Sequence, residues 1–485
     1  MWGSGFGGDR WVAMIVPHLF PHRFPFHLSM TSSATQGFGF SRDQFQQIVE
    51  DVLSMAKALG ASDAGVEVSE GSGLSVSVRK GEVENVERNR DKSVGVSVYL
   101  GQRRGNASTS DFSTLALEQT VRAAYDIARF TAEDPAAGLP DEADLATAEE
   151  AALSLDLFHP WDVTAEEAAE LARRAEAAAL GVDKRITNSE GGSVSAQQSH
   201  FWAGNSRGFR GGYASSRHSL SVSPIAGKGR DMQRDYWYSS MRNALDLAAP
   251  EAVGRYAAER ALSRLKSRKI GTCEVPVLFE STVAAGLLGA YVQGTSGGAL
   301  YRKASFLQDS LGQPVWADHI DVQEDPHIVG GKGSAPFDDE GVRTRARRVV
   351  EAGVVQGYFL SSYSARKLGM RTTGHAGGSQ NLRLVSRLTR PGDHLEEMLR
   401  KLHRGLFVTE LMGQGVNYVT GDYSRGAAGY WVEDGRIAYP VHEITIAGHL
   451  REMLRGVVAV GADAYTLGAK TVGSMLLERM KVAGS

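Results

Sequence analysis

Two serines stand in the glycine-flanked pattern that exposes the nucleophile of many serine hydrolases. They are Ser206, within Gly204–Gly208, and Ser296, within Gly294–Gly298. Such a serine needs a strand before it and a helix after it, because the sharp turn between them holds the hydroxyl in the open. Ser206 is expected to follow a strand with no helix after it, and Ser296 to follow a helix. The pattern therefore disfavours a serine hydrolase, although an autonomous peptidase with an unrecognised site stays an alternative.

One adjacent His-Glu pair, His442 and Glu443, has half of a zinc-peptidase signature. A zinc-binding helix needs a second histidine four residues on, so that both rings share one face, and Ile446 stands there instead. Residues 444–446 read as a strand, on which neighbouring side chains point apart. The pair is predicted to lie at a surface or an interface rather than around a metal.

Four further residues could contact a substrate. His375 lies in a small-residue loop, where it is either an accessible side chain or a hydrogen-bonded turn residue. Asp422, Tyr423 and Arg425 lie within the segment Gly421–Tyr430, which is predicted to be a polar loop. Such a loop either grips a peptide carboxylate or backbone, or is a turn locked by an Asp–Arg pair.

Composition limits the possible functions. The 485 residues contain 53 Lys and Arg against 56 Asp and Glu, a net charge of −3, so no basic excess favours direct contact with nucleic acid or an anionic membrane. One cysteine excludes an internal disulfide and any zinc site built from cysteine pairs. With 56 glycines but 14 prolines, the chain is expected to be rich in tight turns. It carries no membrane-spanning run and is expected to be cytoplasmic.

Local patterns place the elements that must hold these residues. Capping boxes at Ser41 and Thr164 predict helix starts, and Leu74–Leu100 predicts an antiparallel meander with turns at Lys80-Gly81 and Asp91-Lys92. Residues 131–152 are expected to be a loose acidic connector. Further on, a strand at Glu274–Phe279 precedes a small-residue helix at Val283–Val292.

These elements favour an α+β fold with antiparallel sheets. Three segments are predicted. Residues 1–35 are an extra N-terminal extension that is expected to be disordered, and residues 36–268 form an N-terminal α+β domain built from helices and an antiparallel meander. Residues 269–485 form a C-terminal domain of mainly antiparallel β-sheet with few helices. Met30 is a candidate for the true start.

Long strings across the chain resemble the PmbA/TldE family. The resemblance covers residues 31–485 and rests on the following segments: Arg79–Glu87, Lys184–Asn188, Tyr301–Lys303, Ser361–Gly369, Thr373–Gly378, Thr409–Gly415, Gly421–Gly429 and Pro440–Gly448. It implies a TldE-type subunit that pairs with a TldD-type sister in a cytoplasmic metallopeptidase.

The resemblance also locates the metal motif of the TldD-type sister, a His-Glu-x-x-x-His helix with a late cysteine. Anchored on Pro276-Val277 and Arg302-Lys303, the histidines fall on Gly289 and Gly294, the glutamate on Ala290 and the cysteine on Val472. All three ligands and the general base are replaced, so this C-terminal domain is expected to be a degenerate metallopeptidase domain that binds no metal and has no catalytic residue.

The resemblance therefore implies that a TldD-like partner supplies zinc, while this chain shapes a channel for unfolded peptides. His375, Asp422, Tyr423 and Arg425 are the candidate channel residues. Glycine-rich strands could add a peptide strand through backbone hydrogen bonds. Peptide maturation or degradation and antitoxin turnover are the implied processes. A homodimer when the chain is alone, and a non-proteolytic adaptor that modulates gyrase or a toxin–antitoxin system, stay as alternatives.

Overall fold

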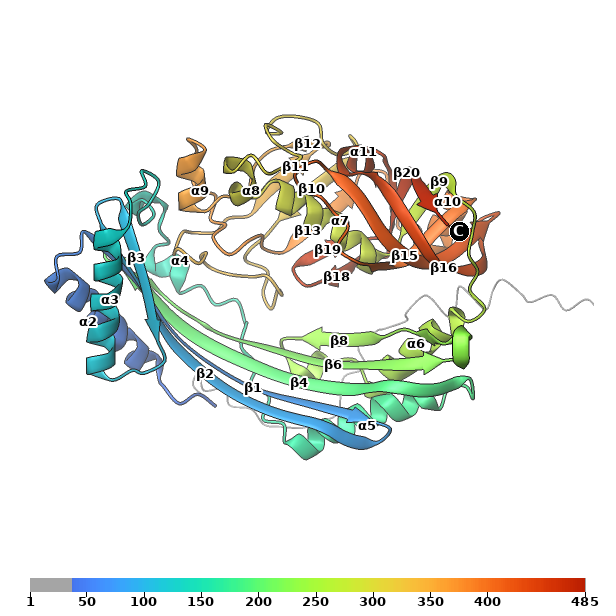
Figure 1. Cartoon of the computed structure of the whole chain (residues 1–485), viewed down its shortest axis with the longest axis horizontal. Coiled ribbons are helices and arrows are strands. Elements are labelled where there is room, and N and C mark those ends of the chain that lie inside the picture. Colours follow the sequence, from blue (N-terminus) through green and yellow to red (C-terminus); the bar gives the residue numbers. More distant parts are fainter. Residues whose placement is uncertain (1–36, 485) are drawn as a thin grey trace, which may run out of the picture.

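The computed structural model describes residues 37–484, so the extension predicted over residues 1–35 lies outside the described part. Figure 1 shows a long curved sheet from the first half of the chain beneath a rounder body from the second half. We call residues 37–268 the N-terminal domain and residues 269–484 the C-terminal domain. The α+β class with mainly antiparallel sheets is confirmed.

One antiparallel sheet forms the N-terminal domain, in the order β3-β2-β1-β4-β6-β7, with β5 beside β4 and β8 beside β6. Its strands are β1 (Asp63–Arg79), β2 (Glu82–Leu100), β3 (Arg103–Thr109), β4 (Ile186–Asn205), β5 (Arg210–Gly211), β6 (Ala214–Ala226), β7 (Gln233–Arg234) and β8 (Trp237–Met241).

Helices cover the convex face of this sheet (Figure 1). They are α2 (Arg42–Ala58), α3 (Thr114–Phe130), α5 (Ala165–Leu180) and α6 (Pro250–Ser263). The short α4 (Ala148–Ala151) lies instead on the concave side, where Ala151 packs near Phe209 and Phe337 (Figure 1). Short 3-10 turns occur at Glu142–Asp144, Gly229–Asp231 and Ala244–Asp246. The capping boxes predicted at Ser41 and Thr164 are both present. Alternate strand residues such as Val66 and Val68 pack under these helices, which leaves the other face of each strand toward the concave side.

The turn predicted at Asp91-Lys92 is wrong. β2 runs through it without a break, because Gly71 and Glu70 of β1 pair with Asp91 and Lys92 across the ladder. A continuous hairpin ladder outweighs the weak turn preference of two charged residues.

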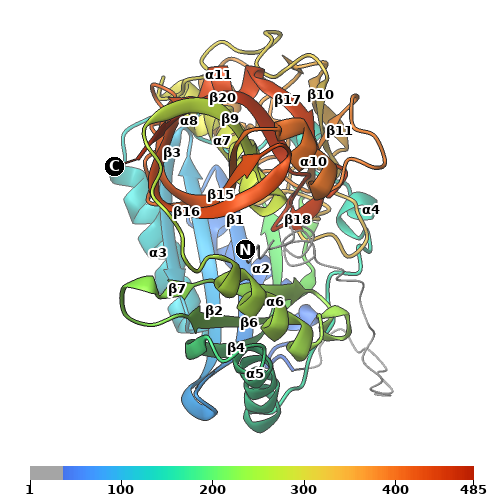
Figure 2. The ribbon, with the colours of Figure 1, turned by 90° about the vertical axis from the view of Figure 1, so that its right-hand side faces the viewer.

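A small barrel is the centre of the C-terminal domain. Strands run β16-β15-β14-β9-β20, and β16 also pairs with β20, which closes the ring seen end-on in Figure 2. The strands are β9 (Cys273–Phe279), β14 (Gly405–Met412), β15 (Asp422–Glu433), β16 (Arg436–His449), β20 (Met475–Ala483) and the attached β17 (Val457–Val460). The predicted loop at Gly421–Tyr430 is wrong, since this segment forms most of β15 and pairs on both sides with β14 and β16.

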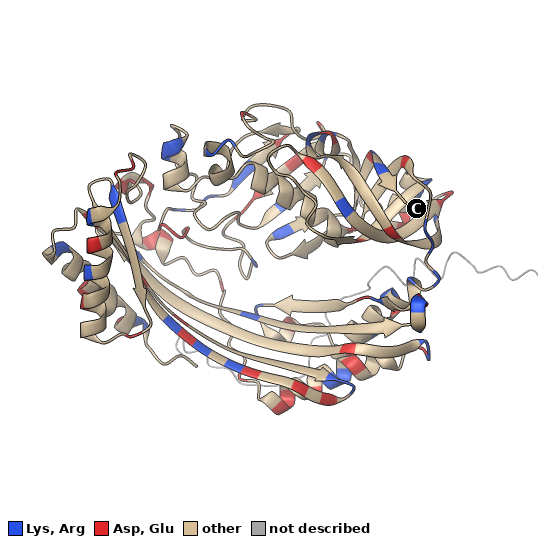
Figure 3. Ribbon diagram, viewed as in Figure 1, with Lys and Arg blue, Asp and Glu red and all other residues tan. Residues whose placement is uncertain are grey.

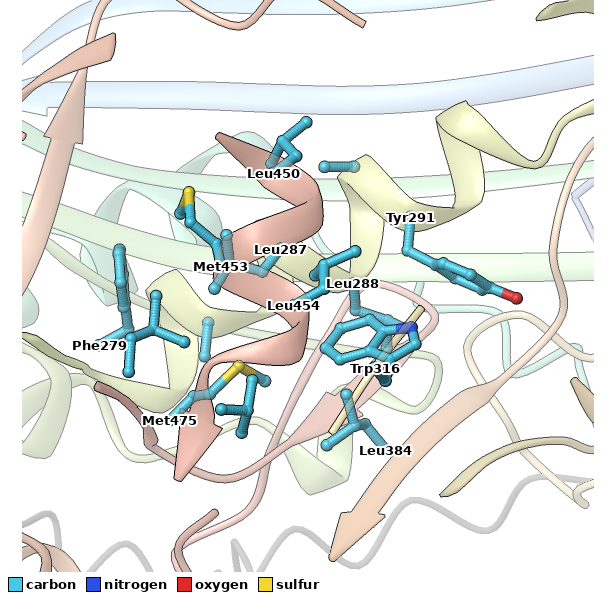
Figure 4. Close-up of a cluster of buried hydrophobic side chains, with 14 of the residues drawn as sticks. Phe279, Leu287, Leu288, Tyr291, Trp316, Leu384, Leu450, Met453, Leu454 and Met475 are labelled. Atoms are coloured by element: carbon cyan, nitrogen blue, oxygen red, sulfur yellow. The ribbon is translucent and has the colours of Figure 1, made fainter. Parts of the chain in front are cut away.

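A second sheet, ordered β12-β11-β10-β13-β19-β18, lies beside the barrel. Its strands are β10 (Ile320–Glu324), β11 (Arg347–Glu351), β12 (Val354–Val355), β13 (Leu382–Ser386), β18 (Tyr465–Leu467) and β19 (Lys470–Val472). The helices are α7 (Ser281–Gly294), α8 (Gly297–Tyr301), α9 (Ser362–Lys367), α10 (Leu395–Leu402) and α11 (Leu450–Arg455). Figure 4 shows Leu287, Leu288 and Tyr291 of α7 packed with Trp316 and Leu454, so α7 is anchored in the main core.

The acidic connector is ordered rather than loose. Lys367 Nζ and the Tyr363 hydroxyl both bond the Asp134 carboxylate at 2.7 Å, and Arg366 donates to the Gly138 carbonyl at 3.1 Å. Its acids and carbonyls therefore meet cations of the C-terminal domain, which sequence-local reasoning could not pair.

A buried ion cluster joins the two domains at the other end of the sheet. Arg260 of α6 donates to Asp235 at 3.2 Å and to Glu280 of the C-terminal domain at 2.9 Å. Arg264 adds an ion pair to Glu410 of β14 at 2.5 Å. Together with the connector, this cluster holds the C-terminal domain over the concave face. Within residues 37–484, no helix is both long and apolar enough to cross a membrane.

Candidate functional site

An open cleft lies between the concave face of the N-terminal sheet and the C-terminal domain. Its volume is about 940 Å³, and its walls come from β1, β2, β4, the connector and the loop around Phe337–Gly341, with Tyr363 of α9. A second hollow of about 410 Å³ is lined by parts of β1, β2, β4 and β6. Ser199 of β4 borders both hollows, so they are neighbours along the sheet.

Strand alternation makes the sheet wall of this cleft polar. The residues that point away from the helices include many serines, and they pair across neighbouring strands. Ser199 and Ser215, which border the smaller hollow, approach to 3.3 Å. Farther along the same face, beyond the two hollows, Ser75 and Ser195 approach to 3.2 Å and Ser193 and Ser221 to 2.9 Å. In Figure 3 few charged residues mark β4, β6 and β8, whereas charges alternate along the β1–β2 hairpin. The wall is a hydroxyl-rich surface that can hydrogen-bond an extended chain without a fixed sequence.

One end of the cleft is acidic. Glu67 of β1 and Asp339 both line it, and neither carboxylate has an ion pair within residues 37–484. Desolvation inside the cleft raises the pKa of Glu67, and the Asp339 carboxylate adds to this rise. Desolvation likewise raises the pKa of Asp339, with Glu340 contributing. Two like charges without a cation make this end suited to an ammonium or another donor group.

The loop that carries Asp339 is fixed by its buried neighbour. The Asp338 carboxylate accepts backbone N–H bonds from Ala376, Glu340 and Val342, each at 2.9 Å. Burial nevertheless raises the pKa of Asp338 to about 7. These bonds set the position of the acidic end.

Aromatic rings line the middle of the cleft. Phe337 stacks edge-on against Phe209 at 4.9 Å and near Tyr213 at 5.7 Å between ring centroids. Burial raises the pKa of Tyr213 to about 12, with Asp339 adding to the rise and Arg242 opposing it. Tyr213 therefore stands between the acidic end and a group of cations at the far end, and its phenol stays protonated as a hydrogen-bond donor.

The residues predicted to stand at the family's metal positions lie elsewhere, where α7 packs against β18 and β19. Gly289 and Gly294 have no side-chain donor atom, Ala290 is buried, and Val472 is fully buried in the main core. A Cβ at Gly294 would come within 2.7 Å of Phe306, so no ligand side chain fits there without repacking. A zinc ion needs three or four nitrogen, oxygen or sulfur ligands, and these residues do not fit one.

A lysine occupies the space beside the first of these glycines. A Cβ at Gly289 would lie 3.8 Å from Lys470 Cε of β19. Partial burial lowers the pKa of Lys470. A cation at this place would repel a metal ion, which adds to the lack of ligand atoms.

Of the candidate channel residues, His375 is buried and hydrogen-bonded. Its Nε2 lies 2.9 Å from Glu324 Oε2 and its Nδ1 lies 2.9 Å from the Thr373 hydroxyl. Arg347 also pairs with Glu324, at 2.7 Å. Burial lowers the pKa of His375, whereas the histidine and Arg347 outweigh burial and lower the pKa of Glu324. Of the two roles considered for His375, the structure has the hydrogen-bonded one and not the accessible one.

The other three candidates lie on β15 rather than on a loop. Asp422 is exposed and accepts from the Thr420 hydroxyl at 2.6 Å, not from Arg425. Tyr423 is buried beside Arg425. None of the four candidates lines the cleft, and His375 is not brought together with the other three.

The two glycine-flanked serines and the His-Glu pair lie in the local structures that their sequence context predicts. Ser206 donates to Asp63 at 2.8 Å in a turn after β4, and Ser296 follows α7 and donates to a carbonyl of that helix. Glu443 is exposed and pairs with Lys269 at 2.9 Å. No cluster of three or more metal-ligating side chains occurs within the described part of the chain.

Sequence reasoning missed the cleft residues, among them Glu67, Tyr213 and Asp339. The alternation of serines with apolar residues along β1, β4 and β6 was the signal available, since it marks one face of a sheet as polar. The backbone groups of β1 and β4 are paired with neighbouring strands on both sides, so this wall cannot add a peptide strand through its backbone.

Comparisons with known proteins cover most of the described chain. Sequence profiles described as PmbA/TldA metallopeptidase domain 1, central domain and C-terminal domain match residues 64–128, 158–265 and 272–484. The chain is 51% identical to the metalloprotease PmbA of Escherichia coli O157:H7, over 90% of this chain and 97% of that protein. It is 46% identical to a PmbA homologue of Haemophilus influenzae, over 91% and 96%.

Solved structures share the fold. A proposed modulator of DNA gyrase from Bacteroides thetaiotaomicron superposes with a TM-score of 0.85 at 26% identity, covering 91% of this chain and 99% of that one. TldE from Thermococcus kodakarensis superposes with a TM-score of 0.76 at 18% identity, covering 90% and 100%. At 18% identity, the second likeness shows the fold alone.

Proposed function

The chain belongs to the PmbA/TldD metallopeptidase family, and from this premise we propose that it is the TldE-type subunit of a heteromeric peptidase acting on unfolded peptides. A TldD-like partner supplies the zinc ion and the general base. This chain receives and positions the peptide. The assembly works in the cytoplasm.

The observation that carries this proposal is the state of α7 and β19. The positions predicted for the family's metal ligands and general base hold Gly289, Ala290, Gly294 and Val472, which have no ligand atom, and Phe306 packs closely against Gly294. A residual zinc site would need new side chains and new space. Water activation by a metal is therefore assigned to the partner.

The cleft supports the second half of the proposal. A folded domain would not reach its floor, because the C-terminal domain is held over the sheet by the connector and by Arg260. An extended peptide has free backbone groups that can bond the serine-rich wall. Tyr213 can donate to a peptide carbonyl, and the acidic end can hold an amino group.

The test is reconstitution. We expect this chain alone to bind no stoichiometric zinc and to leave an unstructured peptide intact, and the mixture with a TldD-like chain to cleave it. Replacing the partner's metal ligands should abolish cleavage. Bound zinc or turnover with this chain alone would overturn the proposal and favour an autonomous peptidase.

A pulldown separates the remaining alternative. Recovery of a TldD-like chain supports the peptidase assembly. Recovery of gyrase or a toxin–antitoxin protein without any TldD-like chain would instead support a non-proteolytic adaptor.

A further inference from the structure

Three cations gather at the end of the cleft opposite Glu67 and Asp339. Arg217 comes from β6, Arg242 follows β8, and Lys332 lies on the loop after β10 in the C-terminal domain. Arg217 and Arg242 line the smaller hollow. All three are partly buried at the junction of the two domains.

Carbonyl groups fix the two guanidinium groups in place. Arg217 donates to the Lys332 carbonyl at 3.0 Å, and Arg242 donates to the carbonyls of Gly331 and Lys332 at 3.0 and 3.1 Å. Arg242 also reaches the Leu157 and Ser216 carbonyls at 3.4 Å. These bonds set the geometry, but a carbonyl carries no net charge and leaves three positive charges side by side.

No carboxylate neutralises this cluster within residues 37–484. Asp91 lines the same hollow but contacts Asn89, and no ion pair joins it to the three cations. The Lys332 ammonium has no hydrogen-bond partner among the described residues. Other arginines that bridge parts of this chain do have acids, as Arg260 has Asp235 and Glu280, and Arg207 has Asp63.

The pKa shifts of the three cations indicate that no negative charge of residues 37–484 lies close to them. Burial lowers the pKa of Arg242 to about 10, and the neighbouring Arg217 lowers it further. Burial also lowers the pKa of Arg217, and burial together with Arg217 lowers the pKa of Lys332. By contrast, the carboxylates around Arg207 raise its pKa. An anion in the hollow would relieve the repulsion and stabilise all three charged forms.

We propose that Arg217, Arg242 and Lys332 form a carboxylate-binding site that holds the C-terminal or a side-chain carboxylate of a peptide lying in the cleft. The proposal deepens, and rests on, the proposed function as a peptide-receiving subunit. Arg217 uses one of its five N–H groups on a carbonyl and keeps the others for a planar acceptor such as a carboxylate. Arg242 uses four of its N–H groups on carbonyls, so it contributes mainly its positive charge.

The position of the site also sets the direction of the peptide. Glu67 pairs with Ala203 of β4 and Arg217 pairs with Gln197, six positions apart on the same strand. At roughly 3.3 Å per residue, this separation is about 20 Å, which an extended segment of about six residues spans. The acidic end repels a carboxylate, so a bound peptide lies with its amino end near Glu67 and its carboxylate at the cations.

The experiment measures peptide binding to the full-length chain at low ionic strength, with a fluorescent eight-residue Gly/Ser/Ala peptide. Three forms are compared: a free C-terminal carboxylate, a C-terminal amide, and an amide whose last residue is Glu. We expect the free acid to bind about tenfold tighter than the amide, since charge-assisted hydrogen bonds to the cations are lost in the amide. The third form separates terminal from side-chain carboxylates: tight binding of it shows that a side chain suffices.

Variants test whether the tighter binding of the free acid depends on these cations. K332Q should remove most of the advantage of the free acid and leave binding of the amide unchanged, because the Lys332 carbonyl that holds both arginines remains. R217Q should do the same. K228Q, at an exposed lysine in the same half of the chain, should change neither affinity. Sulfate should compete with the free acid and not with the amide.

The outcomes are distinct. Equal affinity for the acid and the amide, or an advantage that survives in both K332Q and R217Q, would overturn the carboxylate site while leaving a peptide cleft. Failure of every peptide to bind either this chain or its complex with the partner would overturn the proposed function itself.

Discussion

The α7–β19 contact and the interdomain cleft differ in what their side chains can do. At α7–β19 the residues predicted to stand at the family's metal positions are two glycines, an alanine and a buried valine, and Phe306 and Lys470 lie beside the two glycines. The cleft instead collects groups whose charge is poorly compensated, such as Glu67 and Arg242.

This difference shows how one fold can lose a metal site and keep a surface suited to binding. Small residues on a helix let neighbours pack closely and remove the room that a metal needs, whereas charged groups held by backbone bonds keep their positions without a partner. Charged groups with shifted pKa values in a cleft favour a binding role. Helix positions without ligand atoms favour the loss of metal-dependent catalysis.

The largest expected effect comes from breaking the ion cluster that holds the cleft together and ends beside α7. R260M leaves Glu280 buried without a cation and Asp235 with Arg264 alone, which should lower the free energy of unfolding by about 3–5 kcal/mol. Denaturant unfolding measures this loss. R255M on the exposed side of the same helix is the control and should change stability by less than about 0.5 kcal/mol. A small effect of R260M would mean that the domains do not depend on this cluster.

A second prediction concerns a buried cluster that belongs to neither region. H375A removes a ring that contacts Glu324 and Thr373, and it should lower the free energy of unfolding by about 2–3 kcal/mol. Peptide affinity should stay the same, because His375 does not line the cleft. Lost peptide binding with unchanged stability would instead make His375 a substrate-contacting residue. H442A, at a half-buried histidine without a side-chain hydrogen bond among the described residues, is the control.

The two glycines of α7 give a matched pair. G294A places a methyl 2.7 Å from Phe306 and should lower the free energy of unfolding by about 2 kcal/mol. G289A meets Lys470 at an ordinary 3.8 Å and should raise it by about 0.5–1 kcal/mol, since alanine favours a helix interior over glycine. Thermal or denaturant unfolding of both variants decides. Equal effects of the two changes would contradict close packing at Gly294.

The smallest expected effect is at the acidic end of the cleft. Because the folded pKa of Glu67 lies above its unfolded value near 4.5, the folded state binds the proton more tightly. Stability therefore falls as pH rises from about 4.5 through the folded pKa. E67Q should remove this part of the slope and make the chain more stable at pH 8, by less than about 1 kcal/mol. Unfolding measured at several pH values should show no such flattening for E118Q, on the exposed face of α3.

Short-range patterns predicted the elements well. The helix start at Ser41 depends on Gln44, and the one at Thr164 depends on Glu167, so each lies within a single turn. The strand at Glu274–Phe279 and the following small-residue helix appear as β9 and α7. The predictions failed where a distant strand or domain decides the conformation. Pairing with β1 keeps β2 extended at Asp91, and pairing with β14 and β16 keeps Gly421–Tyr430 extended. Contacts with the C-terminal domain order the connector.

The amino-acid sequence by itself determined the α+β class, the family resemblance and the absence of ligand atoms at Gly289, Ala290, Gly294 and Val472, since residue identity decides which donor atoms exist. Only the tertiary structure brought Arg217, Arg242 and Lys332 together and set them opposite Glu67. These residues come from separate strands and from both domains, and a charge is perturbed only by groups that lie near it in space, however far apart they are along the chain.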